Sequence, residues 1–148
     1  MALSTSPRLL VLDEPTTSLD VTTQASILDL FRDLIKDSNT GVLYVTHNLG
    51  VVAQICDCVA VLYAGELVEN APIKDVFQQP LHPYTRGLLD SVPRLGQRKA
   101  QGELEAIRGQ IPTLTDRSDG CVFEPRCPHA RAICLERPPL YAAMQGRF

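Results

Sequence analysis

The sequence predicts an α/β fold: a mainly parallel sheet with flanking helices, followed by an irregular tail that contains cysteines. Short apolar runs of the kind found in buried strands recur in the first half of the chain. Segments with helical periodicity separate these runs, as in strand-helix-strand units. The tail is predicted from composition, because residues 121–139 hold three cysteines and four prolines, which interrupt regular structure.

The first strand and helix follow directly from these patterns. Residues 9–12 form a continuous apolar run, which predicts a strand buried on both faces. Apolar residues then recur at helical spacing over 21–36, which predicts an amphipathic helix with one face on the sheet. Asp20 stands where its carboxylate can accept from the first free backbone amides of that helix.

The next elements continue the alternation. A β-branched run at 42–46 predicts a second strand, residues 47–56 predict a helix, and residues 58–65 predict a third strand. A further short strand is expected at 65–71 and a short helix at 73–80, where Pro80 stops it. Residues 93–112 are rich in Gly, Gln, Arg and Lys without periodicity, which indicates a linker or extended tail.

Composition and charge exclude several classes. The chain has 148 residues, of which 45% are hydrophobic and 21% charged, as in a soluble globular protein. Its net charge of -3, without a basic stripe, argues against nucleic acid as a partner. Polar residues interrupt the most apolar region, 43–64, so we expect no membrane span, and the start does not have the pattern of a signal peptide. Reducing conditions are therefore expected for the five cysteines.

Two adjacent carboxylates, Asp13 and Glu14, follow the first predicted strand directly. Open α/β sheets bind ligands at the carboxyl ends of their strands. The pair suits metal-assisted phosphoryl transfer: we assign Asp13 to Mg²⁺ and Glu14 to the attacking water. The alternative, from these residues alone, is a strand that ends in solvent.

The second predicted strand ends beside His47. Two consecutive parallel strands ending in Asp-Glu and in His would bring the imidazole to the same ligand, within reach of a terminal phosphate. This combination favours a nucleotide site over a structural histidine.

At this point the sequence resembles the ATP-binding subunits of ABC transporters. "LLVLDEP" is similar to their Walker B strand, "SLD" to the D-loop and "VTHNLG" to the switch-histidine segment. The resemblance implies the C-terminal half of a P-loop ATPase core that uses ATP and Mg²⁺. It also implies that Asp13 is the magnesium-associated aspartate, Glu14 the catalytic base, Asp20 a contact to a second ATP-binding subunit, and His47 the contact to the γ-phosphate.

The stretch "QQPLHPYTRGLLDSVPR", residues 78–94, is similar to the C-terminal extension of oligopeptide and dipeptide importer ATPases. This resemblance implies an ATPase part at 1–79 and an extension at 80–148. It also implies a peripheral location at the cytoplasmic face of the membrane, membrane-spanning permease subunits as partners and, indirectly, a solute-binding protein. From the residues alone, His82 and Tyr84, on either side of Pro83 at a helix start, indicate packing and turn chemistry.

The resemblance also places a phosphate loop, a glutamine loop and an "LSGGQ"-type signature before the Walker B strand. None of them occurs in residues 1–12. We therefore expect the chain to correspond to the C-terminal half of a longer ATPase, beginning inside a helix. By itself it is expected neither to bind ATP tightly nor to hydrolyse it, because phosphoryl transfer depends on the positioning and charge stabilisation that a phosphate loop provides.

Cys121, Cys127 and Cys134 are spaced so that their thiols could converge. Three interpretations stay open: free thiols, an iron-sulfur site, and a zinc site completed by His129. The resemblance implies a [4Fe-4S] cluster, here incomplete or completed by a partner, since only three cysteines are present in the motif. Cys56 and Cys58, among apolar residues, are interpreted as buried thiols.

The leading hypothesis is an ATP-hydrolysing subunit, or a fragment of one, of an ABC importer for oligopeptides, dipeptides or a related small solute. A non-enzymatic module that binds a partner ATPase or carries an iron-sulfur site is the main alternative. A DNA-repair or translation ATPase is a third, and the His-Pro-Tyr-Thr stretch and the lack of a basic surface argue against it.

Overall fold

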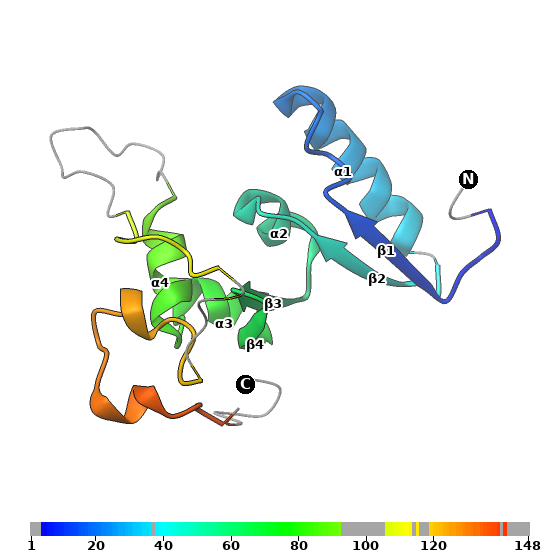
Figure 1. Ribbon diagram of the computed structural model, residues 1–148. Helices are drawn as coiled ribbons and strands as arrows, with labels where there is room; N and C mark the ends of the chain where they lie inside the picture. The colour runs from blue at the N-terminus through cyan, green and yellow to red at the C-terminus, as the bar shows by residue number, and fades with distance from the viewer. Residues whose placement is uncertain are drawn as a thin grey trace, which may run out of the picture. The chain divides into compact units, whose positions relative to one another are not determined.

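The computed structural model describes residues 4–36, 38–92, 106–113, 115, 119–139 and 141. The chain forms two compact units, residues 1–56 and residues 57–148 (Figure 1). Most of the linker predicted at 93–112 falls on residues 93–105, outside the described residues. The part that is described, residues 106–112, contains neither helix nor strand.

The first unit is a strand-helix-strand-helix arrangement. Its elements are β1 (Leu9–Asp13), α1 (Val21–Lys36), β2 (Gly41–Val45) and α2 (Leu49–Ile55). β1 and β2 are parallel and paired in register from Leu9 opposite Gly41 to Asp13 opposite Val45. α1 is the crossover connection that parallel strands require. All four elements were predicted, and the bounds of α1 agree with the prediction.

Capping explains where the helices of this unit begin. One carboxylate oxygen of Asp20 accepts from the backbone N–H groups of Thr22 at 3.1 Å and Thr23 at 3.0 Å, and the other accepts from the Thr23 hydroxyl. The predicted cap is thus confirmed. The Asn48 side chain accepts from the amides of Gly50 and Val51 and begins α2 in the same way.

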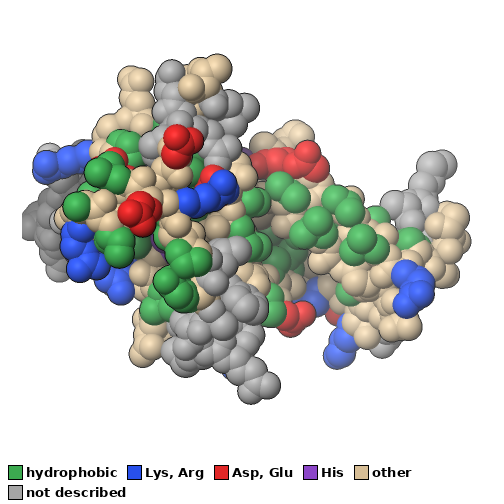
Figure 2. Space-filling model, turned by 60° about the horizontal axis from the view of Figure 1, so that its bottom comes forward, with side chains coloured by type: hydrophobic (Ala, Val, Ile, Leu, Met, Phe, Trp, Pro, Cys, Tyr) green, Lys and Arg blue, Asp and Glu red, His purple; other side chains and the backbone are tan. Residues whose placement is uncertain are grey.

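The two faces of the β1-β2 pair differ. Leu10 is buried on one face, and α1 covers the same unit with buried Leu28 and with Phe31, whose ring lies edge-on to Tyr44. On the other face four apolar side chains are 45–60% exposed: Leu9, Val11, Leu43 and Val45. They share a face because strand residues alternate and paired residues point the same way. Figure 2 shows hydrophobic side chains gathered on the surface of the molecule.

The second unit begins with a hairpin. β3 (Cys58–Tyr63) and β4 (Glu66–Pro72) pair antiparallel, followed by α3 (Ile73–Gln78) and α4 (Pro83–Asp90). Two short 3₁₀ helices, Glu124–Arg126 and Ala132–Leu135, interrupt the tail. Both turn residues, Ala64 and Gly65, have positive φ (47° and 79°), which suits the twist of a two-residue hairpin.

The α/β class is confirmed, with one correction to the expected sheet. Over the described residues the parallel sheet has two strands, β1 and β2. The third predicted strand exists, but as β3 it pairs antiparallel with β4, because the tight turn at Ala64 and Gly65 folds the chain straight back. Cys58, predicted to be buried, is exposed, and Cys56 is half-buried.

The core of the second unit joins the hairpin to the tail. Tyr63, Val122 and Phe123 are buried together. The Phe123 ring lies edge-on to Tyr63 at 5.1 Å between centroids, and Tyr84 at the start of α4 contacts both rings. His82 caps α4 through Nδ1, which accepts from the Tyr84 amide. The role in packing and turn formation expected for His82 and Tyr84 is therefore confirmed.

Candidate functional site

Glu14 follows β1 in an unusual backbone conformation. Its φ is +48°, in the left-handed region that residues with a Cβ seldom adopt. Its amide donates to the Val45 carbonyl at 2.9 Å, so the hydrogen bonding between β1 and β2 continues one residue beyond Asp13. Conformations of this kind are concentrated at functional sites, where the surrounding structure holds them in place.

The Glu14 carboxylate lies against His47. Glu14 Oε1 is 2.6 Å from His47 Nδ1, and the histidine side chain is 75% exposed. The two residues come from the carboxyl ends of the neighbouring parallel strands β1 and β2. The structure therefore brings together the carboxylate and the imidazole that sequence analysis assigned to one ligand, and their catalytic roles stay predictions.

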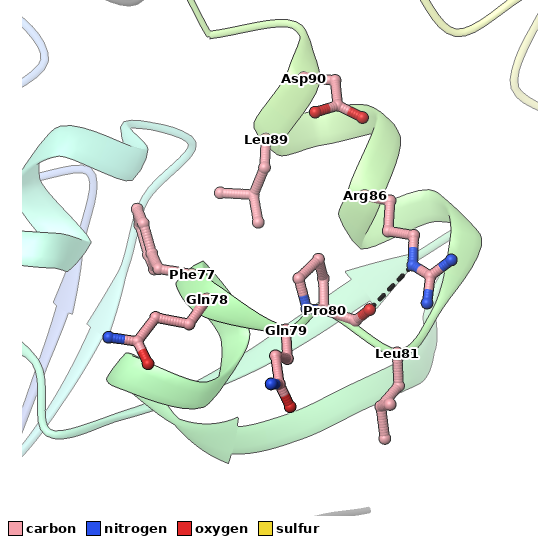
Figure 3. Close-up of a pocket in the computed structure, with 8 residues that line it drawn as sticks. All are labelled: Phe77, Gln78, Gln79, Pro80, Leu81, Arg86, Leu89 and Asp90. Carbon is pink, nitrogen blue, oxygen red and sulfur yellow. Dashed lines mark hydrogen bonds between the residues drawn. The ribbon is translucent and has the colours of Figure 1, made fainter.

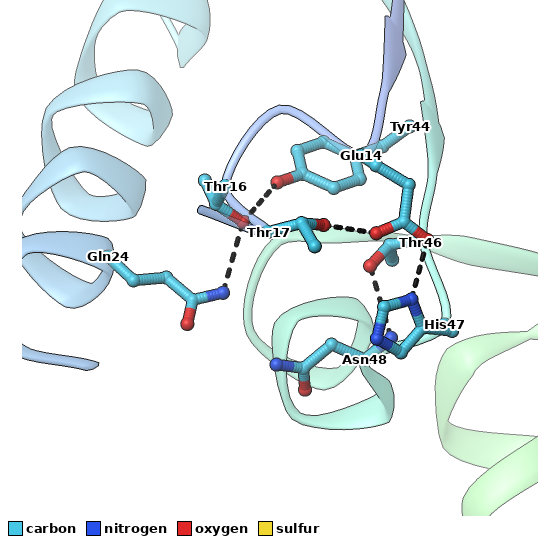
Figure 4. A network of polar contacts seen from close by, with 8 residues as sticks. All are labelled: Glu14, Thr16, Thr17, Gln24, Tyr44, Thr46, His47 and Asn48. Atoms are coloured by element: carbon cyan, nitrogen blue, oxygen red, sulfur yellow. Dashed lines mark hydrogen bonds and ion pairs between the residues drawn. The ribbon is translucent and has the colours of Figure 1, made fainter. Parts of the chain in front are cut away.

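Glu14 has a second partner, Thr17, whose hydroxyl donates to Oε2 (Figure 4). Hydrogen bonds from Thr17 and then from His47 hold the pKa of Glu14 below its usual range, since both stabilise the ionised form. The carboxylate is therefore ionised at neutral pH and can accept a proton or a hydrogen bond.

A buried contact anchors the turn that carries Thr17. Thr16 is only 6% exposed, and its hydroxyl lies 3.2 Å from the Tyr44 hydroxyl of β2. Gln24 of α1 donates to the same Thr16 oxygen at 3.0 Å (Figure 4). Sequence analysis missed Thr16, Thr17, Tyr44 and Gln24. The two threonines directly after the Asp-Glu-Pro stretch were a signal of a polar turn, whereas nothing in the sequence pointed to Tyr44 or Gln24.

Two further residues, Asp13 and Asp20, were predicted to belong to the nucleotide site. Asp13 ends β1 and is exposed. One protein carboxylate beside phosphate oxygens and water is a ligand set that Mg²⁺ commonly takes, so Asp13 fits the predicted ion. Asp20 is occupied as the cap of α1. Hydrogen bonds from Thr23 keep the pKa of Asp20 below its usual range.

The tail cysteines do not form a metal site over the described residues. No group of three or more His, Cys, Asp or Glu side chains there is arranged to hold a metal ion. The Cys121 amide donates to the Cys134 carbonyl at 2.9 Å, while Cys127 packs against the aromatic core. The iron-sulfur and zinc hypotheses for Cys121, Cys127, Cys134 and His129 therefore gain no support from the structure.

A pocket lies elsewhere, in the second unit. It has a volume of about 540 Å³, opens widely to solvent, and is lined by the corner between α3 and α4 (Figure 3). Phe77, Leu81 and Leu89 form its apolar part, and the Arg86 Nε donates to the Pro80 carbonyl at its edge. None of the predicted site residues lines it.

Comparison with known proteins identifies the relationship. Residues 68–134 match the family described as the C-terminal region of oligopeptide/dipeptide transporters. The whole chain is 52% identical to the oligopeptide transport ATP-binding protein OppD of Salmonella typhimurium. The chain is a relative of oligopeptide ABC transporter ATP-binding proteins.

Other relatives agree with this assignment. OppD of Escherichia coli is 51% identical over 149 residues, covering 100% of this chain and 43% of that protein. The oligopeptide transport ATP-binding protein AppD of Bacillus subtilis is 48% identical over 151 residues, covering 99% of this chain and 44% of the relative. The chain likewise spans 44% of the length of the Salmonella protein. Within the described residues, no helix combines the length and apolarity needed to cross a membrane.

Proposed function

We propose that this chain supplies the hydrolytic side chains of the ATP site in an ABC importer for oligopeptides, dipeptides or a related small solute. The observation that carries the proposal is the 2.6 Å contact between Glu14 and His47 at the ends of two parallel strands. Similarity over the whole chain to peptide-transport ATP-binding proteins supports the same class of reaction.

Each residue has a defined role in this proposal. Asp13 would hold Mg²⁺, which would neutralise negative charge on the phosphates. Glu14, ionised and exposed to solvent, orients the attacking water and accepts its proton. With His47 Nδ1 directed to Glu14, Nε2 is the ring nitrogen left to contact the γ-phosphate.

The proposal extends to partners and location. As the resemblance to ATP-binding subunits of ABC transporters implies, the chain acts in such an importer with a second ATP-binding subunit, permease subunits that span the membrane and, indirectly, a solute-binding protein. We propose a peripheral location at the cytoplasmic face of the membrane. Asp20 caps α1, so any contact it makes to a second ATP-binding subunit involves the start of that helix.

A chimera tests the hydrolytic role, because the printed sequence contains no GxxxxGK stretch. The matching 44% of the Salmonella protein is replaced by this chain, and ATP hydrolysis is measured. We expect Glu14→Gln to lower kcat about a hundredfold or more, since it removes the general base. Glu136→Gln makes the same change at an exposed position in the tail and is expected to leave kcat unchanged. A chimera that binds ATP and hydrolyses it equally fast with Glu14→Gln would contradict the proposal.

A further inference from the structure

We propose that Thr17 is a positioning residue for Glu14. Its hydroxyl holds one carboxylate oxygen while His47 holds the other, and together the two contacts fix one orientation of the carboxylate. The inference rests on the proposed function, because it assigns to Thr17 a part in the hydrolysis that Glu14 performs. Sequence analysis gave Thr17 no role of its own.

The geometry of the carboxylate is the first argument. His47 Nδ1 contacts Oε1 and the Thr17 hydroxyl contacts Oε2, so each oxygen has its own partner (Figure 4). The last torsion of a glutamate side chain is broad and turns easily, and a single partner would leave the group free to rotate. Two partners on opposite oxygens select one orientation. Each oxygen keeps lone-pair capacity for water, since an ionised carboxylate offers about four acceptor sites.

The second argument is that the Thr17 hydroxyl is itself held in place. The Thr17 amide donates to the Glu14 carbonyl at 3.3 Å, which closes a turn over residues 14–17. Its neighbour Thr16 is buried and joined to Tyr44 of β2 and Gln24 of α1. Hydrogen bonds thus tie the turn to β2 and to α1. The Thr17 hydroxyl is held in place as a result, and it holds the Glu14 carboxylate in turn.

Loss of this contact has a distinct kinetic signature. A base that misorients acts more slowly on bound substrate but leaves ground-state binding intact. In the chimera, Thr17→Val is expected to lower kcat about tenfold with an unchanged KM for ATP, and Thr17→Ser, which keeps the hydroxyl, is expected to restore kcat. Thr5→Val is the matched control: it makes the same substitution at an exposed threonine that precedes β1, outside this hydrogen-bond network.

A measurement without activity separates positioning from a general effect on the fold. In the full chain, ¹³C NMR relaxation of the Glu14 carboxyl carbon, Cδ, reports the order of the carboxylate. We expect Thr17→Val to lower the order parameter, and Thr17→Ser and Thr5→Val to leave it at the wild-type value. An unchanged order parameter or an unchanged kcat in Thr17→Val overturns the inference.

The two proposals fail in distinguishable ways. If Glu14→Gln leaves hydrolysis unchanged, the proposed function fails, and with it the catalytic meaning assigned to Thr17. If Glu14→Gln abolishes hydrolysis while Thr17→Val keeps both kcat and the order of the Glu14 side chain, the proposed function stands and this inference alone is overturned.

Discussion

The conformation of the single residue Glu14 depends on contacts with residues outside the sequence motif that contains it. Its backbone adopts φ of +48° although it carries a Cβ, its amide extends the β1-β2 hydrogen bonding, and its two carboxylate oxygens contact different side chains. A glycine would adopt this φ more readily but would supply no carboxylate. The neighbouring contacts therefore hold a disfavoured conformation that directs the side chain toward His47.

In the second unit, Glu69 is a glutamate whose two carboxylate oxygens also have separate partners, and it is only 1% exposed. One carboxylate oxygen accepts from the Leu81 amide at 2.9 Å and the other from the His82 amide at 3.0 Å. These are the backbone groups that lead into α4, where no earlier turn of helix is available to accept from them. A single buried side chain of β4 thus fixes the start of α4.

We predict that Glu69→Gln destabilises the chain by about 1–3 kcal/mol. The amide keeps one acceptor oxygen but replaces the other with a donor, which leaves one of the two backbone N–H groups without its partner. Denaturation in urea, followed by circular dichroism, measures the change. Glu136→Gln, at an exposed tail position, is expected to change the stability by less than about 0.5 kcal/mol. Equal stabilities for the two variants would contradict the role assigned to Glu69.

At the scale of elements, the sequence predicted local structure better than pairing. α1 was predicted with its observed bounds because apolar periodicity and the Asp20 cap are both local signals. The antiparallel pairing of β3 was missed because its cause, a two-residue turn with positive φ at Ala64, lacks the Asn-Gly or Asp-Gly signal of such turns. The strand itself was recognised, but its partner depended on backbone angles.

In the candidate site, too, local features were predicted from the sequence and long-range contacts were not. The motif around Glu14 and the strand end before His47 lie within short stretches, and sequence reasoning placed both at one edge of the sheet. Tyr44 is 28 residues from Thr16, and their contact depends on the register of β1 and β2. Long-range side-chain contacts of this kind have no sequence period, so the anchor of the turn became visible only in the folded chain.

The exposed face of β1 and β2 supports a prediction about association. Val11 and Leu43 lie opposite each other on it and are 57% and 54% exposed. Apolar patches next to open strand edges promote self-association, so we expect the purified chain to associate as its concentration rises. The double variant Val11→Thr, Leu43→Thr places a β-branched residue, which suits a strand, at both positions and is expected to associate only at higher concentration, as measured by sedimentation velocity.

A control for this prediction comes from α1. Val21→Thr changes an 83% exposed valine that lies outside the sheet face. It is expected to leave the association unchanged, because a single exposed apolar side chain is ordinary on protein surfaces. If both variants associate like the wild type, another surface is responsible.

At the scale of the whole molecule, the arrangement of chemistry along the chain matters more than any one contact. The candidate hydrolytic residues belong to the first unit, residues 1–56, while residues 68–134, which match the C-terminal region of oligopeptide/dipeptide transporters, belong to the second. The relatives are more than twice as long as this chain, which spans 44% of the Salmonella protein. Glu14, the proposed general base, and His47 are present, but the 148 residues contain no GxxxxGK stretch.

We predict from this distribution that the purified 148-residue chain neither binds Mg²⁺-ATP tightly nor turns it over. Phosphoryl transfer is catalysed almost entirely by positioning and charge stabilisation, and a base without a phosphate-binding loop has no fixed substrate to act on. Calorimetric titration with Mg²⁺-ATP and an assay of phosphate release test the two parts separately. Steady hydrolysis that disappears in Glu14→Gln would contradict the prediction, whereas hydrolysis that persists in that variant would point to a contaminating ATPase. Because Glu14 and His47 contact each other in this chain, inactivity would place the deficit in phosphate binding and not in the formation of the dyad.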